Sequence, residues 1–230
     1  MRKLFLSLLF LSSISIAALA QKGRVYVAAD FTGISYSLPV NLQVVIGDKY
    51  EIKAVGSVED IDLIVVEKSG NSLILKSKSG RHRFDSDTKI YVSLPKLSMI
   101  SSAGSGRINV NDVVKGESLE VSLAGSGEIQ LQAVDLGEIS VSVAGSGNVK
   151  VEEHSKVNFG VYKIAGSGNI SFSALQAKNV DVNIAGSGNV NAYASEKLTV
   201  KIVGSGNVTC TGSPKSVDKV KFGSGSVNIR

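Results

Sequence analysis

Apolar and polar residues alternate along most of the chain after residue 100, with a period of two. Ile139, Val141 and Val143 are separated by serines, and the alternation resumes at Val149 and Val151 after a short interruption. Alternation of β-branched and polar residues predicts strands that bury one face. No segment after residue 20 holds a comparable helical period. The pattern therefore predicts an all-β protein.

The interruption between alternating segments is the tripeptide Gly-Ser-Gly, which occurs seven times. Successive copies begin 21, 20, 21, 20, 18 and 19 residues apart. A near-constant period of this length is typical of a solenoid, whereas apolar alternation does not interrupt flexible linkers. We therefore predict a right-handed parallel β-helix, a solenoid with coils of ~20 residues that lie about 4.8 Å apart.

Each Gly-Ser-Gly is the predicted corner of a coil, where the chain passes from one sheet to the other. A corner needs a positive φ or a close approach between neighbouring coils, and glycine permits both. The predicted corner glycines are Gly104, Gly106, Gly125, Gly127, Gly145, Gly147, Gly166, Gly168, Gly186, Gly188, Gly204, Gly206, Gly223 and Gly225.

The residues on either side of the corners also recur. Alanine precedes four of them, at Ala124, Ala144, Ala165 and Ala185. We interpret these alanines as the small residues that a crowded bend requires. Asparagine follows four consecutive corners, at Asn148, Asn169, Asn189 and Asn207. We expect their side-chain amides to bond as a ladder, and no aspartate follows a corner as a calcium-binding β-roll would require.

Residues 21–100 lack the tripeptide but remain rich in β pattern. The expected strands are 35–46, 49–55, 61–67, 72–77 and 88–94. We interpret 21–100 as the less regular beginning of the solenoid or as a cap on its open edge, and 101–230 as the regular coils. A separate N-terminal domain is disfavoured, because no Pro- or Ser-rich linker intervenes.

The first 20 residues do not resemble folded structure. Arg2 and Lys3 precede an apolar stretch, which ends in the small-residue sequence Ala18-Leu19-Ala20. This order predicts a secretory signal peptide over 1–20. The apolar run is too short and too rich in serine to span a bilayer, so we expect no transmembrane segment after its removal. Secretion without a possible intrachain disulfide predicts the periplasm or outer surface of a Gram-negative bacterium.

Charge and aromatic content exclude one class of partner. The formal net charge of +5 falls to +3 when the signal peptide leaves, and the chain has no Trp and only 6% aromatic residues. A mild charge and few stacking platforms give no reason to expect a nucleic-acid partner.

Several segments together resemble a known family. They are "FTGISYSLPVNLQVVIGDKYEIKAVG", "SLILKS", "KIYVSLPKLSMISSAGSGRINV" and the repeated "AGSGNV" or "AGSGNI". This combination is similar to the head GIN-domain family, secreted bacterial proteins described as auto-transporter adhesins. The resemblance covers nearly all of the chain after the signal peptide, and it implies a β-helical fold and a role in adhesion at the cell surface.

Residues that carry chemistry are few, and we predict no catalytic residue, metal site or cofactor. Gly-Ser-Gly lacks the further glycine and the helix of a phosphate-binding loop. Cys210 lies in an alternating strand, which predicts a small buried hydrophobe rather than a reactive thiol. The densest acidic cluster is Glu152, Glu153 and His154. It is a candidate site for polysaccharide cleavage if its carboxylates face each other, and otherwise a solvated loop.

One basic run is a candidate for contacts with anionic polysaccharide or lipid phosphate. It contains Lys76, Lys78, Arg81, His82 and Arg83. The alternative is a solvated turn.

We expect a non-enzymatic protein that contacts surface polysaccharide, a host or cell-surface glycan, or a protein. Exposed polar positions would carry the recognition, at Ser140, Ser142, Lys150, Asp181, Asn183 and Lys201. Two alternatives remain open. One is a carbohydrate-active enzyme of the pectin lyase type, and the other is a homo-oligomeric structural protein of the cell envelope that stacks through its terminal coils.

Overall fold

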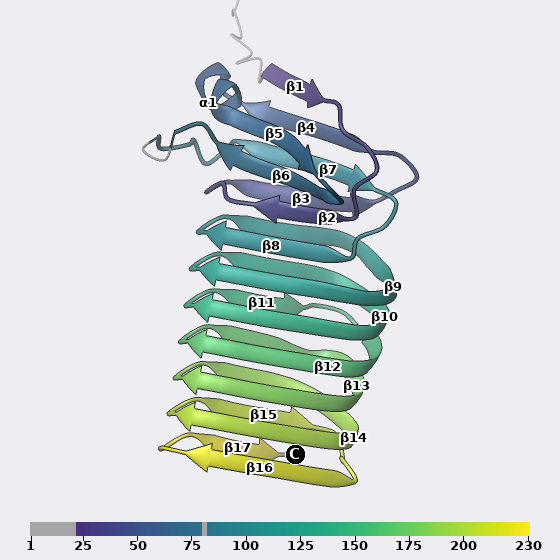
Figure 1. The fold of residues 1–230 in the computed structure, drawn as a ribbon, viewed down its shortest axis with the longest axis vertical. Coiled ribbons are helices and arrows are strands. Elements are labelled where there is room, and N and C mark those ends of the chain that lie inside the picture. Colours follow the sequence, from purple (N-terminus) through teal and green to yellow (C-terminus); the bar gives the residue numbers. More distant parts are fainter. Residues whose placement is uncertain (1–21, 80–81) are drawn as a thin grey trace, which may run out of the picture.

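The computed structural model describes residues 22–79 and 82–230, and 71% of the chain is strand. Two narrow sheets face each other and form a solenoid of about seven turns (Figure 1). The near strands run to the left, and the chain returns on the far side as it descends, which is a right-handed winding. The predicted parallel β-helix is thus confirmed. The predicted signal peptide lies outside the described residues.

The regular coils are built from ten strands. These are β8 (Met99–Gly104), β9 (Arg107–Gly125), β10 (Glu128–Gly145), β11 (Asn148–Val151), β12 (Ser155–Gly166), β13 (Asn169–Gly186), β14 (Asn189–Gly204), β15 (Asn207–Thr211), β16 (Ser216–Phe222) and β17 (Ser226–Ile229). Neighbouring coils pair in parallel, and Gly125, Gly145 and Gly166 align directly across them. The long strands β9, β10, β13 and β14 bend from one sheet into the other.

The corners use glycine for both of the expected reasons. The first glycine has φ between 114° and 132° in all seven corners. A Cβ on Gly145 would lie 2.6 Å from the carbonyl oxygen of Gly125, and one on Gly147 would lie 2.8 Å from that of Gly127. The same Gly125 oxygen accepts hydrogen bonds from the amides of Ser146 and Gly147, both at 2.9 Å. The corners therefore stack through their backbones, and a side chain would separate the coils.

The interior is a column of aligned apolar side chains. One row contains Ile108, Ile129, Val149, Ile170, Val190 and Val208, none of which is exposed. Full burial of each such side chain contributes roughly 1.5–3 kcal/mol. Cys210 is also fully buried, as predicted, and burial raises the pKa of its thiol.

One interior position departs from this regularity. Gly160 aligns with Ile139 and Val180, so an apolar side chain is missing there. The ring of Tyr162 occupies the space and packs edge-on against Phe172 at 5.2 Å between ring centroids. Its buried hydroxyl has no hydrogen-bond partner among the described residues.

The N-terminal segment contains seven strands and a helix. These are β1 (Lys22–Tyr26), β2 (Gly33–Tyr36), β3 (Asn41–Ile46), β4 (Glu51–Gly56), α1 (Val58–Leu63), β5 (Ile64–Ser69), β6 (Ser72–Ser77) and β7 (Lys89–Leu94). β2 and β3 pair in parallel with β8 and β9, so parallel stacking already begins here. β1 with β4, β4 with β7 and β5 with β6 are antiparallel, and they lie at the end of the solenoid where α1 is found (Figure 1).

The single strand predicted over 35–46 was wrong. The chain forms β2 and β3 with a break over 37–40, where Pro39 has no amide hydrogen to donate to a ladder. Tyr36 aligns with Ser102 and Asn41 aligns with Arg107, so the break lies beside a Gly-Ser-Gly corner. It is therefore a corner of the solenoid that contains no glycine.

The strand predicted to begin at residue 61 was also wrong at its start, because α1 occupies Val58–Leu63. The Ser57 hydroxyl accepts a hydrogen bond from the amide of Asp60 at 3.2 Å and caps the helix. Glu59 and Asp60 lie in the first turn, where negative charge is favourable. This local capping signal stops the strand before β5.

Candidate functional site

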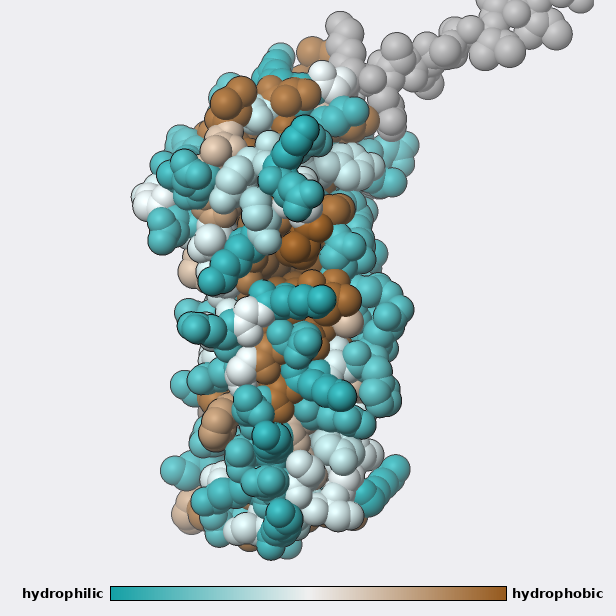
Figure 2. Space-filling view, turned by 90° about the vertical axis from the view of Figure 1, so that its right-hand side faces the viewer, coloured by the Kyte–Doolittle hydropathy of each residue, from teal (hydrophilic) through white to brown (hydrophobic). Residues whose placement is uncertain are grey.

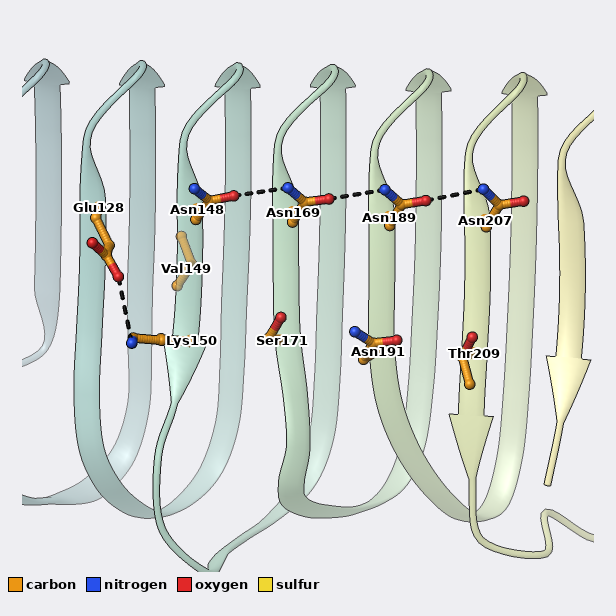
Figure 3. Close-up of a pocket in the computed structure, with 10 residues that line it drawn as sticks. All are labelled: Glu128, Asn148, Val149, Lys150, Asn169, Ser171, Asn189, Asn191, Asn207 and Thr209. Atoms are coloured by element: carbon orange, nitrogen blue, oxygen red, sulfur yellow. Dashed lines mark hydrogen bonds and ion pairs between the residues drawn. The ribbon is translucent and has the colours of Figure 1, made fainter.

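The asparagines that follow the corners form the ladder predicted from the sequence (Figure 3). Asn169 donates to Asn148 at 2.8 Å, Asn189 to Asn169 at 2.9 Å, and Asn207 to Asn189 at 3.0 Å, each from Nδ2 to Oδ1. The Ser226 hydroxyl continues the row by donating to Asn207 Oδ1 at 2.7 Å. All the amides therefore point the same way along the solenoid.

A second polar row lies beside the ladder on the same sheet. It contains Lys150, Ser171, Asn191 and Thr209, two residues after each asparagine. The two rows border a shallow groove of about 580 Å³. We call these eight residues the asparagine face. No hydrogen bond is described for the side chains of Ser171, Asn191 and Thr209, so they are available to an external ligand.

Ion pairs extend the asparagine face toward the N-terminal end. Glu128 Oε2 contacts Arg107 at 2.9 Å, and Lys150 lies 3.5 Å from Glu128 and 2.8 Å from Glu152. The hydrogen bond to Glu152 is the main cause that raises the pKa of Lys150. The charged end of the face is thus internally neutralised, whereas the amide and hydroxyl end is not charged at all.

The acidic cluster lies in the exposed bend between β11 and β12. Glu152 accepts a hydrogen bond from Gln130 at 2.6 Å, and Glu153 accepts one from Gln132. His154 Nε2 lies 3.3 Å from Gln176 Nε2. Each side chain thus contacts a neighbouring coil. Within 22–79 and 82–230, no three His, Cys, Asp or Glu side chains converge as a metal ion would require.

The basic run is spread over separate contacts. Lys76 pairs with Glu67 at 2.8 Å on the β5–β6 hairpin, and Lys78 donates to the Asp62 carbonyl at 2.7 Å. Arg83 is exposed, and Arg81 lies outside the described residues.

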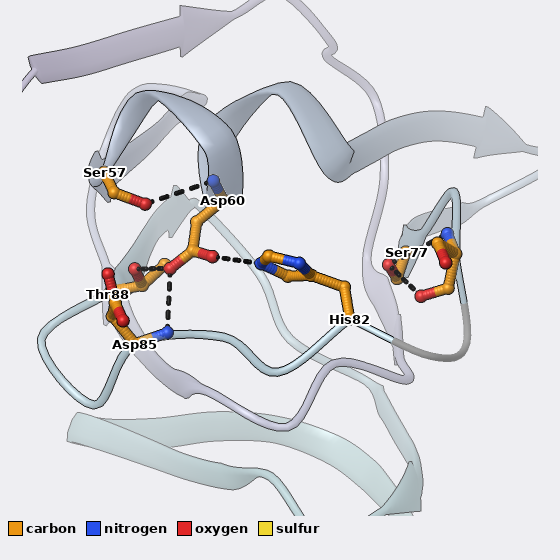
Figure 4. Close-up of polar contacts among 7 residues, drawn as sticks. Ser57, Asp60, Ser77, His82, Asp85 and Thr88 are labelled. Atoms are coloured by element: carbon orange, nitrogen blue, oxygen red, sulfur yellow. Dashed lines mark hydrogen bonds and ion pairs between the residues drawn. The ribbon is translucent and has the colours of Figure 1, made fainter.

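His82 belongs to a different group, the buried polar cluster around Asp60 (Figure 4). The Asp60 carboxylate is 2% exposed and contacts His82 Nε2 at 2.6 Å, the Asp85 amide at 2.9 Å and the Thr88 hydroxyl at 2.5 Å. Burial alone would raise the pKa of Asp60, but the bonds from Thr88, His82 and Asp85 together lower it. The cluster ties α1 to the segment before β7. It went unpredicted because its members are 22 to 28 residues apart in the irregular part of the chain.

An apolar groove of about 440 Å³ lies on the outer surface of the other sheet. Its exposed apolar residues are Ala144, Ala165, Ala185 and Val203, which align across four coils, and its floor is Val143, Ile164 and Ile184. Lys163 and Lys201 line it as well. We call this site the alanine groove. The alanines were predicted to sit in a crowded bend, and this was wrong, because they are exposed.

The exposed polar residues predicted to carry recognition are divided between the two sheets. Lys150 lies on the asparagine face. The others, Ser140, Ser142, Asp181, Asn183 and Lys201, lie on the strands of the second sheet. A single ligand on one flat face therefore does not reach all of them.

The side of the solenoid opposite the corners carries a narrow strip of apolar side chains bordered by polar ones (Figure 2). A separate groove of about 320 Å³ extends over β10, β12, β13 and β14, and Lys156, Lys178 and Tyr193 are among the residues that line it. Among the described residues, no helix has the length and hydrophobicity to cross a membrane.

Known structures share this fold. A "putative adhesin" from Bacteroides fragilis aligns with a TM-score of 0.87 and 23% identity, over 93% of this chain and 98% of that one. A "putative lipid binding protein" from Parabacteroides distasonis aligns with a TM-score of 0.73 and 27% identity, over 91% and 96%. A "putative adhesin" from Parabacteroides merdae aligns with a TM-score of 0.67 and 17% identity, over 91% and 96%.

The search among curated proteins finds no match. The family described as "Putative auto-transporter adhesin, head GIN domain" matches residues 30–214, which is most of the chain. The matched region contains the asparagine ladder, the alanine groove and all but the last of the Gly-Ser-Gly corners. The chain therefore belongs to this head GIN-domain family.

Proposed function

We propose that this chain is a secreted, non-enzymatic adhesin that contacts surface polysaccharide through the asparagine face. The observation that carries the proposal is the pair of polar rows, repeated at the spacing of the coils. Successive side chains in a row lie about 4.8 Å apart, so a linear polymer can meet a polar side chain at every coil. The predicted signal peptide and the family both favour a place outside the cytoplasm.

The chemistry of the asparagine face suits the hydroxyl groups of sugars. Amide side chains supply both donors and acceptors, and Ser171 and Thr209 add hydroxyls. Each such hydrogen bond contributes only about 0.5–1.5 kcal/mol, and none of the ten residues that line the groove is aromatic. We therefore expect weak single contacts and a strong dependence on polymer length.

A pair of matched double variants tests this proposal. Replacement of Asn191 and Thr209 by alanine removes two side chains of the asparagine face that make no described hydrogen bond. Replacement of Asn179 and Thr199 by alanine makes the same chemical change on the outer surface of the second sheet. On a polysaccharide array, only the first variant should lose binding. Equal signals from wild type and both variants would refute the proposal.

The enzymatic alternative depends on Glu152, Glu153 and His154. Glu152 is paired with Lys150 and is hydrogen-bonded by Gln130, which favours a structural role over that of a general acid. The family and two of the structures above are described as adhesins, which also favours a non-enzymatic role. Loss of polyuronide turnover in a Glu152→Gln variant would establish the enzyme instead.

The self-stacking alternative depends on the last coil. Lys219 and Lys221 of β16 align with the buried Val200 and Ile202 of β14. Charges at inward positions of an edge strand oppose pairing with another chain. We therefore expect a monomer at every concentration, and analytical ultracentrifugation would detect filaments if this expectation is wrong.

Lipid binding is a second candidate function, favoured by the alanine groove. The groove exposes apolar surface on the outer face of the second sheet, and Lys163 and Lys201 line it. The P. distasonis structure described as a lipid binding protein adds support. Binding of any amphiphile to the wild-type protein, measured by calorimetry, tests this function.

A further inference from the structure

We infer that the alanine groove binds one acyl chain of an anionic amphiphile, whose acidic headgroup pairs with Lys163 and Lys201. The inference rests on the lipid-binding function proposed above and assigns that function to a site and a ligand class. It is independent of the asparagine face, which lies on the other sheet.

The length of the groove matches that of a single acyl chain. The residues of this row that line the groove, Ala144, Ala165, Ala185 and Val203, align in direct register over three coil steps, or about 14 Å. The same row continues to Ala124 and Ala103 at one end and to Phe222 at the other. One leaflet of a bilayer, half of a core of about 30 Å, holds acyl chains of similar length. Alanine leaves a hollow above the buried floor, and Val203, which is 55% exposed, borders its C-terminal end.

The two lysines beside the groove are positively charged and form no ion pair among the described residues. Lys163, Asn183 and Lys201 align in the neighbouring row, so the two lysines are about 10 Å apart along the axis. Neither lysine has an ion pair among the described residues, whereas Lys76, Lys150 and Lys197 do. In the adjoining row, Asp181 of β13 accepts a hydrogen bond from Asn183 at 2.8 Å, and Asp218 of β16 pairs with Lys197 at 3.1 Å. A carboxylate headgroup placed over Asn183 is within reach of both lysines.

The surroundings favour one chain over a wider apolar surface. Ser142 and Asn183 lie with Lys163 in the row beside the alanines and are half-buried. A bilayer or a large apolar protein surface would bury these polar groups without partners, at a cost. A single chain that lies along the alanine row leaves these two side chains in water.

Calorimetry with a matched series of amphiphiles tests the inference. Hexadecanoate below its micellar concentration is the probe, and hexadecyltrimethylammonium has the same chain with the opposite charge. We expect the Lys163→Gln/Lys201→Gln variant to bind hexadecanoate about five- to tenfold more weakly and the cationic chain no more weakly than wild type does. The control Lys156→Gln/Lys178→Gln, which removes two lysines that line a different groove, should bind hexadecanoate as wild type does.

A second variant tests the apolar part. Ala165→Gln fills the centre of the row, and exclusion of even two methylenes should weaken both amphiphiles by about tenfold or more. Circular dichroism and the melting temperature would show that each variant remains folded. Because Ala165 is exposed, we expect both to match wild type.

The outcomes separate the two proposals. If wild type binds neither amphiphile, the lipid-binding function itself fails. If wild type binds but the lysine and Ala165 variants bind equally well, the function stands and the assigned site is wrong. If hexadecyltrimethylammonium binds as tightly as hexadecanoate, the headgroup assignment is overturned. If wild type is a dimer and Ala165→Gln is a monomer, the groove is an interface between copies and the inference is overturned.

Discussion

The regular coils and the N-terminal segment are stabilised in different ways. In the coils, Gly145 and its counterparts stack backbone on backbone, and each coil repeats the contacts of the last. In the N-terminal segment, the carboxylate of Asp60 gathers a histidine, a threonine and a main-chain amide around one buried charge. Repetition spreads stability over many equivalent contacts, whereas a single buried centre concentrates it in a few atoms.

The largest effect is expected at a corner. Gly145→Ala places a methyl group 2.6 Å from the Gly125 oxygen and forces alanine to a φ of 118°. Backbone strain and overpacking together should lower the free energy of unfolding by about 3–5 kcal/mol. Chemical denaturation measures the change. Ser146→Ala, at the exposed position next to it, is the control and should have little effect.

The second effect should arise in the buried polar cluster. Asp60→Asn removes a charge that accepts three hydrogen bonds and turns an amide hydrogen toward donors. We expect a loss of about 2–4 kcal/mol in the free energy of unfolding. Asp62→Asn removes an exposed carboxylate that pairs with Arg24, and its effect should be much smaller. Similar losses for both variants would contradict the central role of Asp60.

The same carboxylate makes the two regions respond differently to acid. The folded state lowers the pKa of Asp60, so its stabilisation is present above the unfolded value of about 3.9. It is lost as the pH falls through the folded pKa. Hydrogen exchange measured at pH 7, 5 and 3 should therefore show that the amides of α1 and β7 lose protection at a higher pH than those of β9 to β14. In Asp60→Asn this difference between pH 5 and pH 3 should shrink.

A smaller effect, and a gain, is expected inside the coils. Tyr162→Phe removes a buried hydroxyl that has no partner among the described residues, and should raise the free energy of unfolding by about 1–2 kcal/mol. Tyr36→Phe is the matched control, because its hydroxyl donates to the Val40 carbonyl at 2.7 Å. Thermal unfolding should therefore show opposite shifts for the two substitutions.

The smallest effect should come from the asparagine ladder. Asn169→Ala interrupts two exposed side-chain hydrogen bonds, which should lower the free energy of unfolding by about 1 kcal/mol. Asn191→Ala, in the second row, removes an amide without a described hydrogen bond and should leave stability unchanged. If both variants behaved alike in denaturation, the ladder would contribute nothing to the coils.

The sequence predicted what repeats and missed what occurs once. The corners follow from the period of Gly-Ser-Gly, and the ladder follows from Asn148 and its three counterparts, because residues a coil apart must align. Pro39 was a visible signal for the break between β2 and β3, and Ser57 was one for α1. The Asp60–His82 contact joins residues that are 22 apart and that no sequence repeat relates, so no pattern in the sequence predicts it.

The alanine groove shows a different limit. Ala144, Ala165 and Ala185 were recognised as a recurring set, but their small size was attributed to crowding. Small side chains can also leave a hollow in a surface. Only the exposure of the row shows that these alanines line a groove and do not fill a crowded bend. Lysine two residues before the alanine position, at Lys163 and again before Val203 at Lys201, was the additional signal.

The aligned corners also have an evolutionary consequence. Because each coil bonds chiefly to the one before and the one after, a duplication or deletion of one whole coil preserves the pattern of backbone hydrogen bonds at the corners on either side. The number of coils then determines the length of the outer surfaces of both sheets. The length of the protein can thus change in discrete increments of about 4.8 Å per coil.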